Sequence, residues 1–141
     1  MEEVVHARGH EHVTADHAST FEVTTDDYLT PAGDCIVGIE ADRAPADFDP
    51  AFAEACRDPD TRIEVELTAG GRTDTVTGWG HPDLSFESGR SAVVRTSDYV
   101  DERTVMVGAD AAAGDLDRSL VTALSRGAPL LIRFQLTSSP P

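Results

Sequence analysis

The chain contains no lysine: all 11 of its basic residues are arginine, and they face 26 acidic residues. The net charge of −15 argues against a nucleic-acid-binding protein, because contacts with phosphate groups need clustered basic side chains. Aspartate outnumbers glutamate by 16 to 10, a bias typical of proteins from salt-loving archaea. At 1 M salt the Debye length is roughly 3 Å, so such a charge causes little self-repulsion. An acidic surface for a basic partner is the alternative explanation.

Cysteine and long apolar runs are also scarce. The two cysteines, Cys35 and Cys56, are too few for a disulfide framework, and 141 residues suffice for one domain with its own core. The longest apolar run, residues 129–132, has the length of a strand and falls short of the roughly 20 residues of a membrane span. No charged and then apolar leader begins the sequence. We therefore expect a soluble, cytoplasmic, single-domain protein without a membrane segment.

The two halves of the chain resemble each other, which indicates a tandem duplication. The first half contains GH, FEVTTDDY, VGIEAD, DFD, FAEAC and RIEVELT in this order, and the second half contains GH, AVVRTSDY, VMVGAD, DLD, LVTAL and LIRFQLT. The offset is 71 residues up to Tyr28 and Tyr99, 68 at Asp42 and Asp110, and 69 at the closing threonines. The first half therefore carries a three-residue insertion.

Each half is predicted to fold as strand, strand, strand, helix, strand, with repeat 1 at 1–70, repeat 2 at 71–137 and a frayed tail at 138–141. Apolar residues alternate with polar ones along the predicted strands. Asp49 and Asp117 are predicted to cap the helix starts, and Gly127 to follow the second helix. Cys56 lies on the apolar stripe of its helix and is expected in the core. The predicted class is α+β: a pseudo-two-fold, barrel-like, β-rich domain with one closed or nearly closed sheet.

Over residues 8–42, the run RGHEHVTADHASTFEVTTDDYLTPAGDCIVGIEAD resembles an archaeal family known as domain of unknown function 371. The residues that carry the resemblance are Gly9-His10, His17, Thr20, Glu22, Leu29-Thr30, Gly33-Asp34-Cys35-Ile36 and Gly38. The resemblance implies an archaeal, cytosolic origin. It implies no particular chemistry.

Three of the five histidines lie in the run GHEHVTADH, residues 9–17. The Gly-His pair recurs at Gly80-His81, so we interpret His10 and His81 as structural residues, where glycine permits an unusual turn and histidine bonds the backbone. His6 and His12 are expected to be solvated. His17 differs, because its match in the second half is Ser88.

The first half also contains polar residues that have no polar counterpart in the second half. Glu22 matches Val93 in the comparison of the two halves, and the insertion leads into Asp34-Cys35. The candidate site residues, which we expect to converge, are His10, His17, Glu22, Asp34 and Cys35. Imidazole, carboxylate and thiolate groups suit zinc or another divalent transition metal, although their spacing fits no established metal motif. A nucleophilic pair of Cys35 with a histidine and plain surface divergence are the alternatives.

Two functions remain open from the sequence. The first is a small enzyme or a protein that binds a small ligand or metal, with its site in the first repeat. The second is a non-catalytic module that docks a protein partner on its duplicated sheet. A pocket bounded by the five candidate residues would favour the first function, and an exposed apolar patch elsewhere would favour the second.

The acid-tyrosine turns at 26–28 and 98–99 recur in both halves, and we interpret them as side-chain-capped turns. Residues 1–70 hold 17 acids and 4 arginines, whereas residues 71–141 hold 9 acids and 7 arginines. An anionic ligand or a protein partner is therefore expected at the second half, near Arg90, Arg95 or Arg103.

The uneven charge predicts that folding depends on salt. Repulsion within the acidic first half is unscreened at low ionic strength, so the free energy of unfolding should fall as KCl is diluted. Urea unfolding followed by circular dichroism in dilute and in concentrated KCl measures this difference. Equal stability at both salt concentrations would contradict the prediction.

Overall fold

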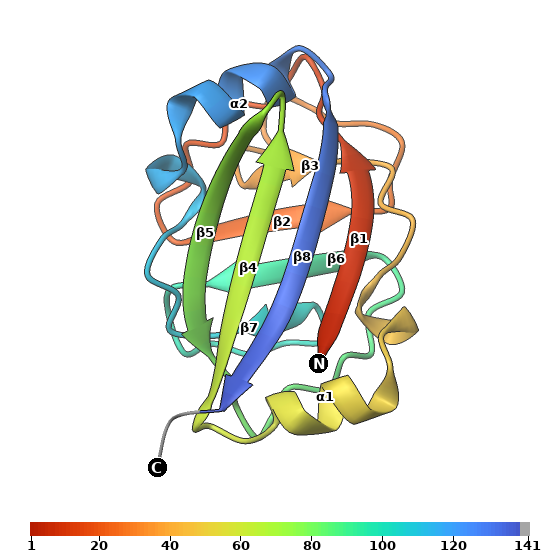
Figure 1. Cartoon of the computed structure of the whole chain (residues 1–141). Coiled ribbons are helices and arrows are strands. Elements are labelled where there is room, and N and C mark those ends of the chain that lie inside the picture. The colour runs from red at the N-terminus through yellow and green to blue at the C-terminus, as the bar shows by residue number, and fades with distance from the viewer. Residues whose placement is uncertain (139–141) are drawn as a thin grey trace.

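This computed structural model describes residues 1–138. They contain eight strands and two α-helices, and a short 3-10 helix precedes each α-helix (Figure 1). The first half contains β1 (Glu2–Arg8), β2 (Thr20–Thr24), β3 (Ile36–Gly38), η1 (Pro45–Asp47), α1 (Pro50–Cys56) and β4 (Thr61–Ala69). The second half contains β5 (Arg72–Trp79), β6 (Ser91–Arg95), β7 (Thr104–Met106), η2 (Ala113–Asp115), α2 (Arg118–Ser125) and β8 (Pro129–Ser138). The α+β class is confirmed. Of the predicted tail, Ser138 ends β8 and 139–141 lie outside the described residues.

The strands of residues 1–138 form two four-stranded sheets, in the orders β1-β8-β4-β5 and β3-β2-β6-β7, and no closed barrel. This corrects the expectation of one closed sheet. At two corners the sheets are joined by isolated bridges, from Arg8 to Ile39 and from Trp79 to Val107. The residues that follow the bridges, Glu40 and Gly108, have left-handed φ angles of 55° and 58°, so the ladder cannot continue beyond one residue.

The core lies between the two sheets. In Figure 1 the strands β5, β4, β8 and β1 stand in front, the strands of the other sheet run across behind them, and α1 and α2 lie near opposite ends of the front strands. Cys56 has no exposed surface and belongs to the core as predicted, and burial raises the pKa of its thiol to about 12. Other large side chains with almost no exposure are Phe21, Ile39, Ile63, Leu67, Leu84, Met106, Leu120, Leu124, Leu130 and Ile132.

Both helices begin, and the second one ends, as the sequence predicts. The Asp49 carboxylate accepts the backbone N–H of Ala51, and the Asp117 carboxylate accepts those of Ser119 and Leu120. Gly127 follows α2 with a φ of 82°, a conformation that glycine adopts without strain. No helix within residues 1–138 is long and apolar enough to cross a membrane.

Gly9 and Gly80 lie where a strand end of one half touches the helix end of the other half. A Cβ atom on Gly9 would overlap the backbone carbonyl of Leu124 at the end of α2, and one on Gly80 would overlap the carbonyl of Cys56 at the end of α1. Neither glycine has a positive φ. Close backbone approach, and not the unusual turn that we expected, therefore explains the recurring glycine.

Further bonds recur at matched positions of the two halves. The Asp42 carboxylate accepts the N–H of His6 at 2.9 Å, and the Asp110 carboxylate accepts the N–H of Thr77 at 2.9 Å. The element order is also the same in both halves. Common ancestry of the halves stays a prediction that these recurring contacts support.

The close approach at these glycines predicts that Gly9→Ala and Gly80→Ala each lower the free energy of unfolding by about 3 kcal/mol, because the helix end must move. Gly89→Ala is the matched control, since nothing lies within 4 Å of a Cβ at Gly89. Urea unfolding of the three variants measures the effect. A loss at Gly89 equal to that at Gly9 would show that backbone approach is not the cause.

Candidate functional site

His10 and His81 make the same hydrogen bond in the two halves. Nδ1 of His10 accepts the backbone N–H of His12 at 3.0 Å, and Nδ1 of His81 accepts that of Asp83 at 3.0 Å. The ring of His12 lies 5.1 Å from that of His10, so His12 is half-buried and not simply solvated. His6 is exposed, as expected, but its ring nitrogen lies 3.4 Å from the Asp42 carboxylate. The bonds of His10 and His81 agree with a structural role.

His17 caps the start of β2. Its Nδ1 accepts the backbone N–H groups of Ser19 and Thr20 at 3.2 and 3.1 Å. In the second half, Oγ of Ser88 accepts the N–H groups of residues 90 and 91 in the same pattern, both at 3.2 Å. A ring nitrogen and a hydroxyl thus fill one structural role, although the residue types differ.

The other three candidates lie in adjacent segments. The backbone carbonyl of Asp34 accepts the N–H of His17 at 3.3 Å, and the carbonyl of Cys35 accepts the N–H of Glu22 at 2.9 Å. Sγ of Cys35 lies 4.0 Å from the Glu22 carboxylate. The structure therefore brings the segments of four candidates together, whereas the hydrogen bonds of His10 stay within residues 10–13.

This arrangement gives little support to nucleophilic or metal chemistry at the five residues. Burial raises the pKa of the Cys35 thiol, and the negative charges of Glu22 and Asp34 raise it further. The thiolate, which is the reactive form, is therefore disfavoured. Among the described residues, no group of three or more His, Cys, Asp or Glu side chains is placed to hold a metal ion.

Glu22 instead belongs to a network of charges on the face of the β3-β2-β6-β7 sheet that points away from the core. Its carboxylate lies 3.5 Å from Arg103, and Arg103 shares the Asp101 carboxylate with Arg95 at 3.1 and 3.0 Å. Arg95 is buried and also donates to the Thr104 hydroxyl at 2.8 Å. Two arginines and two carboxylates therefore balance each other.

The environment of Asp101 strongly favours its ionised form. Burial alone would raise its pKa, but hydrogen bonds from the backbone and side chain of Arg103, with the charges of Arg95 and Arg103, lower it to about 2. Asp101 thereby fixes two guanidinium groups on this face.

Two exposed tyrosines stand at opposite ends of the paired strands β2 and β6, and each contacts an arginine. Tyr28 is 57% exposed, and its hydroxyl lies 3.4 Å from Arg90, which binds Asp26 through Nε and Nη2. Tyr99 is 60% exposed, and its ring centroid lies 4.8 Å from the Arg95 guanidinium. The two ends are opposite because each tyrosine follows one of two antiparallel strands, β2 and β6.

Hydroxyl groups cap both tyrosine turns. Oγ1 of Thr24 accepts the N–H of Asp26 at 3.1 Å, and Oγ of Ser97 accepts the N–H of Tyr99 at 3.3 Å. Both turns thus have side-chain caps, but the two capping residues do not occupy matched positions in the two halves.

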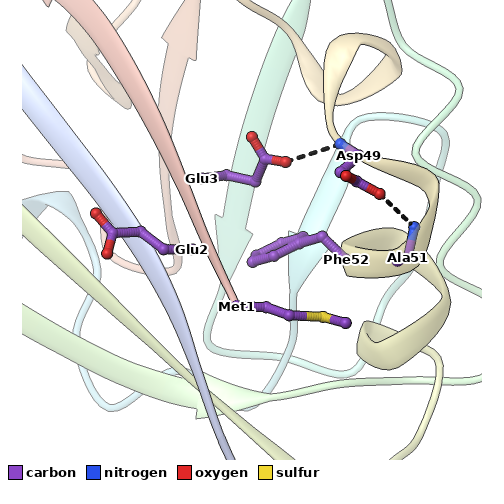
Figure 2. Close-up of a pocket in the computed structure, with 6 residues that line it drawn as sticks. All are labelled: Met1, Glu2, Glu3, Asp49, Ala51 and Phe52. Atoms are coloured by element: carbon purple, nitrogen blue, oxygen red, sulfur yellow. Dashed lines mark hydrogen bonds between the residues drawn. The ribbon is translucent and has the colours of Figure 1, made fainter.

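Two pockets flank α1, and none of the five candidate residues lines either of them. The first, of about 230 Å³, is lined by Met1, Glu2, Glu3, Asp49, Ala51 and Phe52. Figure 2 shows the side chains of Met1 and Phe52 side by side, Glu3 turned toward Asp49, and Glu2 turned away. The Glu3 carboxylate is occupied, because it accepts the N–H of Asp49 at 2.7 Å and pairs with Arg43 at 2.6 Å.

The second pocket, of about 200 Å³, lies on the other side of α1. Its lining residues are Pro45, Ala46, Phe48, Pro50, Ala53, Arg57, Ser85 and Phe86. Six of these eight residues are proline, alanine or phenylalanine, and one guanidinium group stands among them. The residue composition suits a small ligand with a flat or apolar group.

A family model described as "Domain of unknown function (DUF371)" matches residues 5–137. The chain belongs to this family. An uncharacterised protein of the archaeon Methanocaldococcus jannaschii is 41% identical to it over 134 residues, which cover 95% of this chain and 98% of the relative. The likeness noted over residues 8–42 therefore extends over nearly the whole length of this DUF371 member.

Several residues of the exposed face and of the pockets were missed by sequence reasoning. The tyrosines were taken only as turn residues, and Pro50 only as a helix start. The sequence contained one signal for the second pocket. Pro50 stands where the second half has Arg118, although the two helix starts are otherwise similar. Exposure of the tyrosines, in contrast, depends on how the turns fold.

The lowered pKa of Asp101 predicts a pH-dependent contribution to stability. A carboxyl group with an ordinary pKa of 3.8 and a folded-state pKa of about 2 stabilises the folded state by about 2 kcal/mol above pH 4, and this contribution is lost as the pH falls through 2. Asp101→Asn should therefore lower the free energy of unfolding by about 2 kcal/mol at pH 7. The difference from the wild type should shrink toward pH 2.

Urea unfolding at several pH values measures this difference. Glu102→Gln is the control. Glu102 is an exposed neighbour of Asp101, and within residues 1–138 its carboxylate makes no hydrogen bond or ion pair with Arg95 or Arg103. The prediction fails if both variants lose the same stability at pH 7, or if the effect of Asp101→Asn is undiminished at pH 2.

Proposed function

We propose that this protein is a non-catalytic interaction module that binds a partner protein through the exposed surface around the two tyrosine turns that follow β2 and β6. The observation that carries the proposal is the pair of exposed tyrosines, Tyr28 and Tyr99. Each tyrosine contacts an arginine that is itself paired with an aspartate: the Tyr28 hydroxyl lies 3.4 Å from Arg90, and the Tyr99 ring lies against Arg95.

Tyrosine and arginine are enriched at the points of protein interfaces that contribute most to affinity. When such side chains bind a partner they usually lose conformational freedom, which costs about 0.5–1.5 kcal/mol of binding free energy for each ordered side chain. Here the Asp26 carboxylate holds Arg90, and the Asp101 carboxylate holds Arg95. This pre-ordering supports a docking role for the face.

Charge indicates the kind of partner. The chain carries a net charge of −15, so association with a basic protein is electrostatically favoured. An anionic ligand at Arg90, Arg95 or Arg103 would have to compete with the carboxylates that already bind these arginines. We therefore propose a partner that presents apolar groups to the tyrosines and basic side chains around them.

A site for catalysis, a small ligand or a metal at His10, His17, Glu22, Asp34 and Cys35 is the second hypothesis. It has less support, because His10 and His17 use their Nδ1 atoms for backbone bonds and the Cys35 thiol is held in its protonated form. A cytoplasmic location and a salt-loving archaeal source belong to the proposal, supported by the acid-rich, lysine-free composition.

The proposal predicts that Tyr28→Ala and Tyr99→Ala each weaken partner binding about 30-fold, which corresponds to a loss of about 2 kcal/mol at an interface anchor. Because both rings are exposed, stability should change by less than about 0.5 kcal/mol. Immobilised protein and an extract of the source cells provide the assay, with retained proteins quantified by mass spectrometry.

Thr75→Ala is the control, since Thr75 is exposed on the other sheet. A basic protein retained by the wild type and by Thr75→Ala, but released from both tyrosine variants, would support the proposal. Retention of the same proteins by all variants, or of no basic protein by the wild type, would refute it.

A further inference from the structure

The second half of the chain binds one of its own arginines in a small cradle of backbone carbonyl groups. Arg118, the first residue of α2, donates through Nε to the carbonyl of Leu116 at 2.9 Å. Its Nη2 donates to the carbonyls of Ala113 and Ala15 at 2.8 and 3.1 Å. Three carbonyl oxygens from η2 and from the segment before β2 thus receive one guanidinium group.

The same backbone arrangement is present beside α1. The residues Pro45, Phe48, Phe86 and Pro50 match Ala113, Leu116, Ala15 and Arg118. The local bonds also match, because the N–H of Ala46 donates to the carbonyl of Ser88 at 2.9 Å and the N–H of Gly114 donates to that of His17 at 2.9 Å. Phe86 and Ala15 even share a left-handed φ, of 54° and 46°.

Where the second half has Arg118, the first half has Pro50, which offers no hydrogen-bond donor. The pocket of about 200 Å³ lies at this place. Its lining includes Pro50 and all three residues that match the carbonyl cradle, Pro45, Phe48 and Phe86. The first half therefore leaves open a site that the second half fills with its own side chain.

We propose that this pocket binds the guanidinium group of a ligand, in the position that the Arg118 side chain takes in the second half. The inference does not depend on the proposed docking face of the tyrosines. The chemical match is direct, because a planar guanidinium presents its donors in a fixed fork that suits several carbonyl acceptors. The match rests on the backbone carbonyl groups, since the rings of Phe48 and Phe86 are buried in the core.

The backbone of Phe86 keeps the arrangement of the second half in spite of a bulky side chain. A bulky residue with a left-handed φ is rare and costs about 1–3 kcal/mol. Ala15 takes this conformation at the matched position with a far smaller side chain. The side chain of Phe86 packs in the core, and the residue also lines the pocket that lacks an internal arginine.

Arg57 also lines this pocket, but its charge is already balanced. It donates to the Glu54 carboxylate at 2.7 Å and to the carbonyls of Leu84 and Ser85 at 2.8 and 3.5 Å. Ser85 lines the pocket, but none of these groups belongs to the three carbonyls of the proposed cradle. Residues 1–70 carry 17 acids and 4 arginines, which favours a cationic ligand over an anionic one. A carboxylate bound to Arg57 is the competing possibility, and the experiment includes it.

The test measures binding of three probes to the whole protein by isothermal titration calorimetry. Agmatine represents a small guanidinium compound, an N-acetylated and C-amidated arginine represents the side chain of a polypeptide, and benzoate represents a carboxylate. We expect saturable binding of at least one guanidinium probe and none of benzoate. The tighter of the two guanidinium probes identifies the source of the ligand.

Two variants locate the site. Pro50→Arg supplies the missing arginine from the chain itself and should weaken guanidinium binding at least tenfold. Ala51→Arg is the matched control, because it adds the same charge one position further along α1 at an exposed residue outside this pocket and should leave binding unchanged. Arg118→Ala should open the second cradle and raise the stoichiometry from one to two, which keeps the test available if Pro50→Arg does not fold.

The outcomes are distinct. The proposal is overturned if the wild type binds neither guanidinium probe at millimolar concentration, or if benzoate binds in their place. Equal weakening by Pro50→Arg and Ala51→Arg overturns it as well, because charge alone would then explain the effect. An unchanged stoichiometry in folded Arg118→Ala would show that the carbonyl cradle does not bind a free guanidinium.

Discussion

The contact between each helix end and the strand end of the opposite half holds this fold together, because the backbones there approach so closely that only glycine fits. Gly9 lies against the end of α2, and Gly80 lies against the end of α1. The helix of each half is therefore positioned by a strand end of the other half, at the open end between the two sheets. The position of η1 and η2, and with them the carbonyl cradles, follows from these contacts because the 3-10 helices directly precede α1 and α2.

Features that depend on neighbouring residues could be predicted from the sequence. The aspartate caps at Asp49 and Asp117, the glycine after α2 and the buried Cys56 all follow from short-range patterns, and the structure confirms them. The division into two sheets could not be predicted. It depends on left-handed residues, among them Glu40, whose type gives no hint of that conformation.

The candidate site shows the same limit. A difference in residue type, such as His17 against Ser88, was interpreted as a difference in role, yet both side chains accept the same pair of backbone N–H groups. The difference between Pro50 and Arg118 carries more weight, because one side chain fills a cradle and the other leaves it open. Residue types alone do not separate these two cases, since the hydrogen bonds that distinguish them appear only in the folded chain.

The corners where the two sheets meet also cover the edges of the front sheet. Along β1, the backbone of His6 exchanges bonds with Asp42, and Arg43 donates to the carbonyl of Val4. Along β5, the backbone of Thr77 is bonded in the same way by Asp110. These bonds occupy the edge backbone at Val4, His6 and Thr77, which hinders a neighbouring molecule from adding a strand there. Because the bonds lie within one molecule, this obstacle to aggregation remains in concentrated salt, where a net charge of −15 no longer keeps molecules apart.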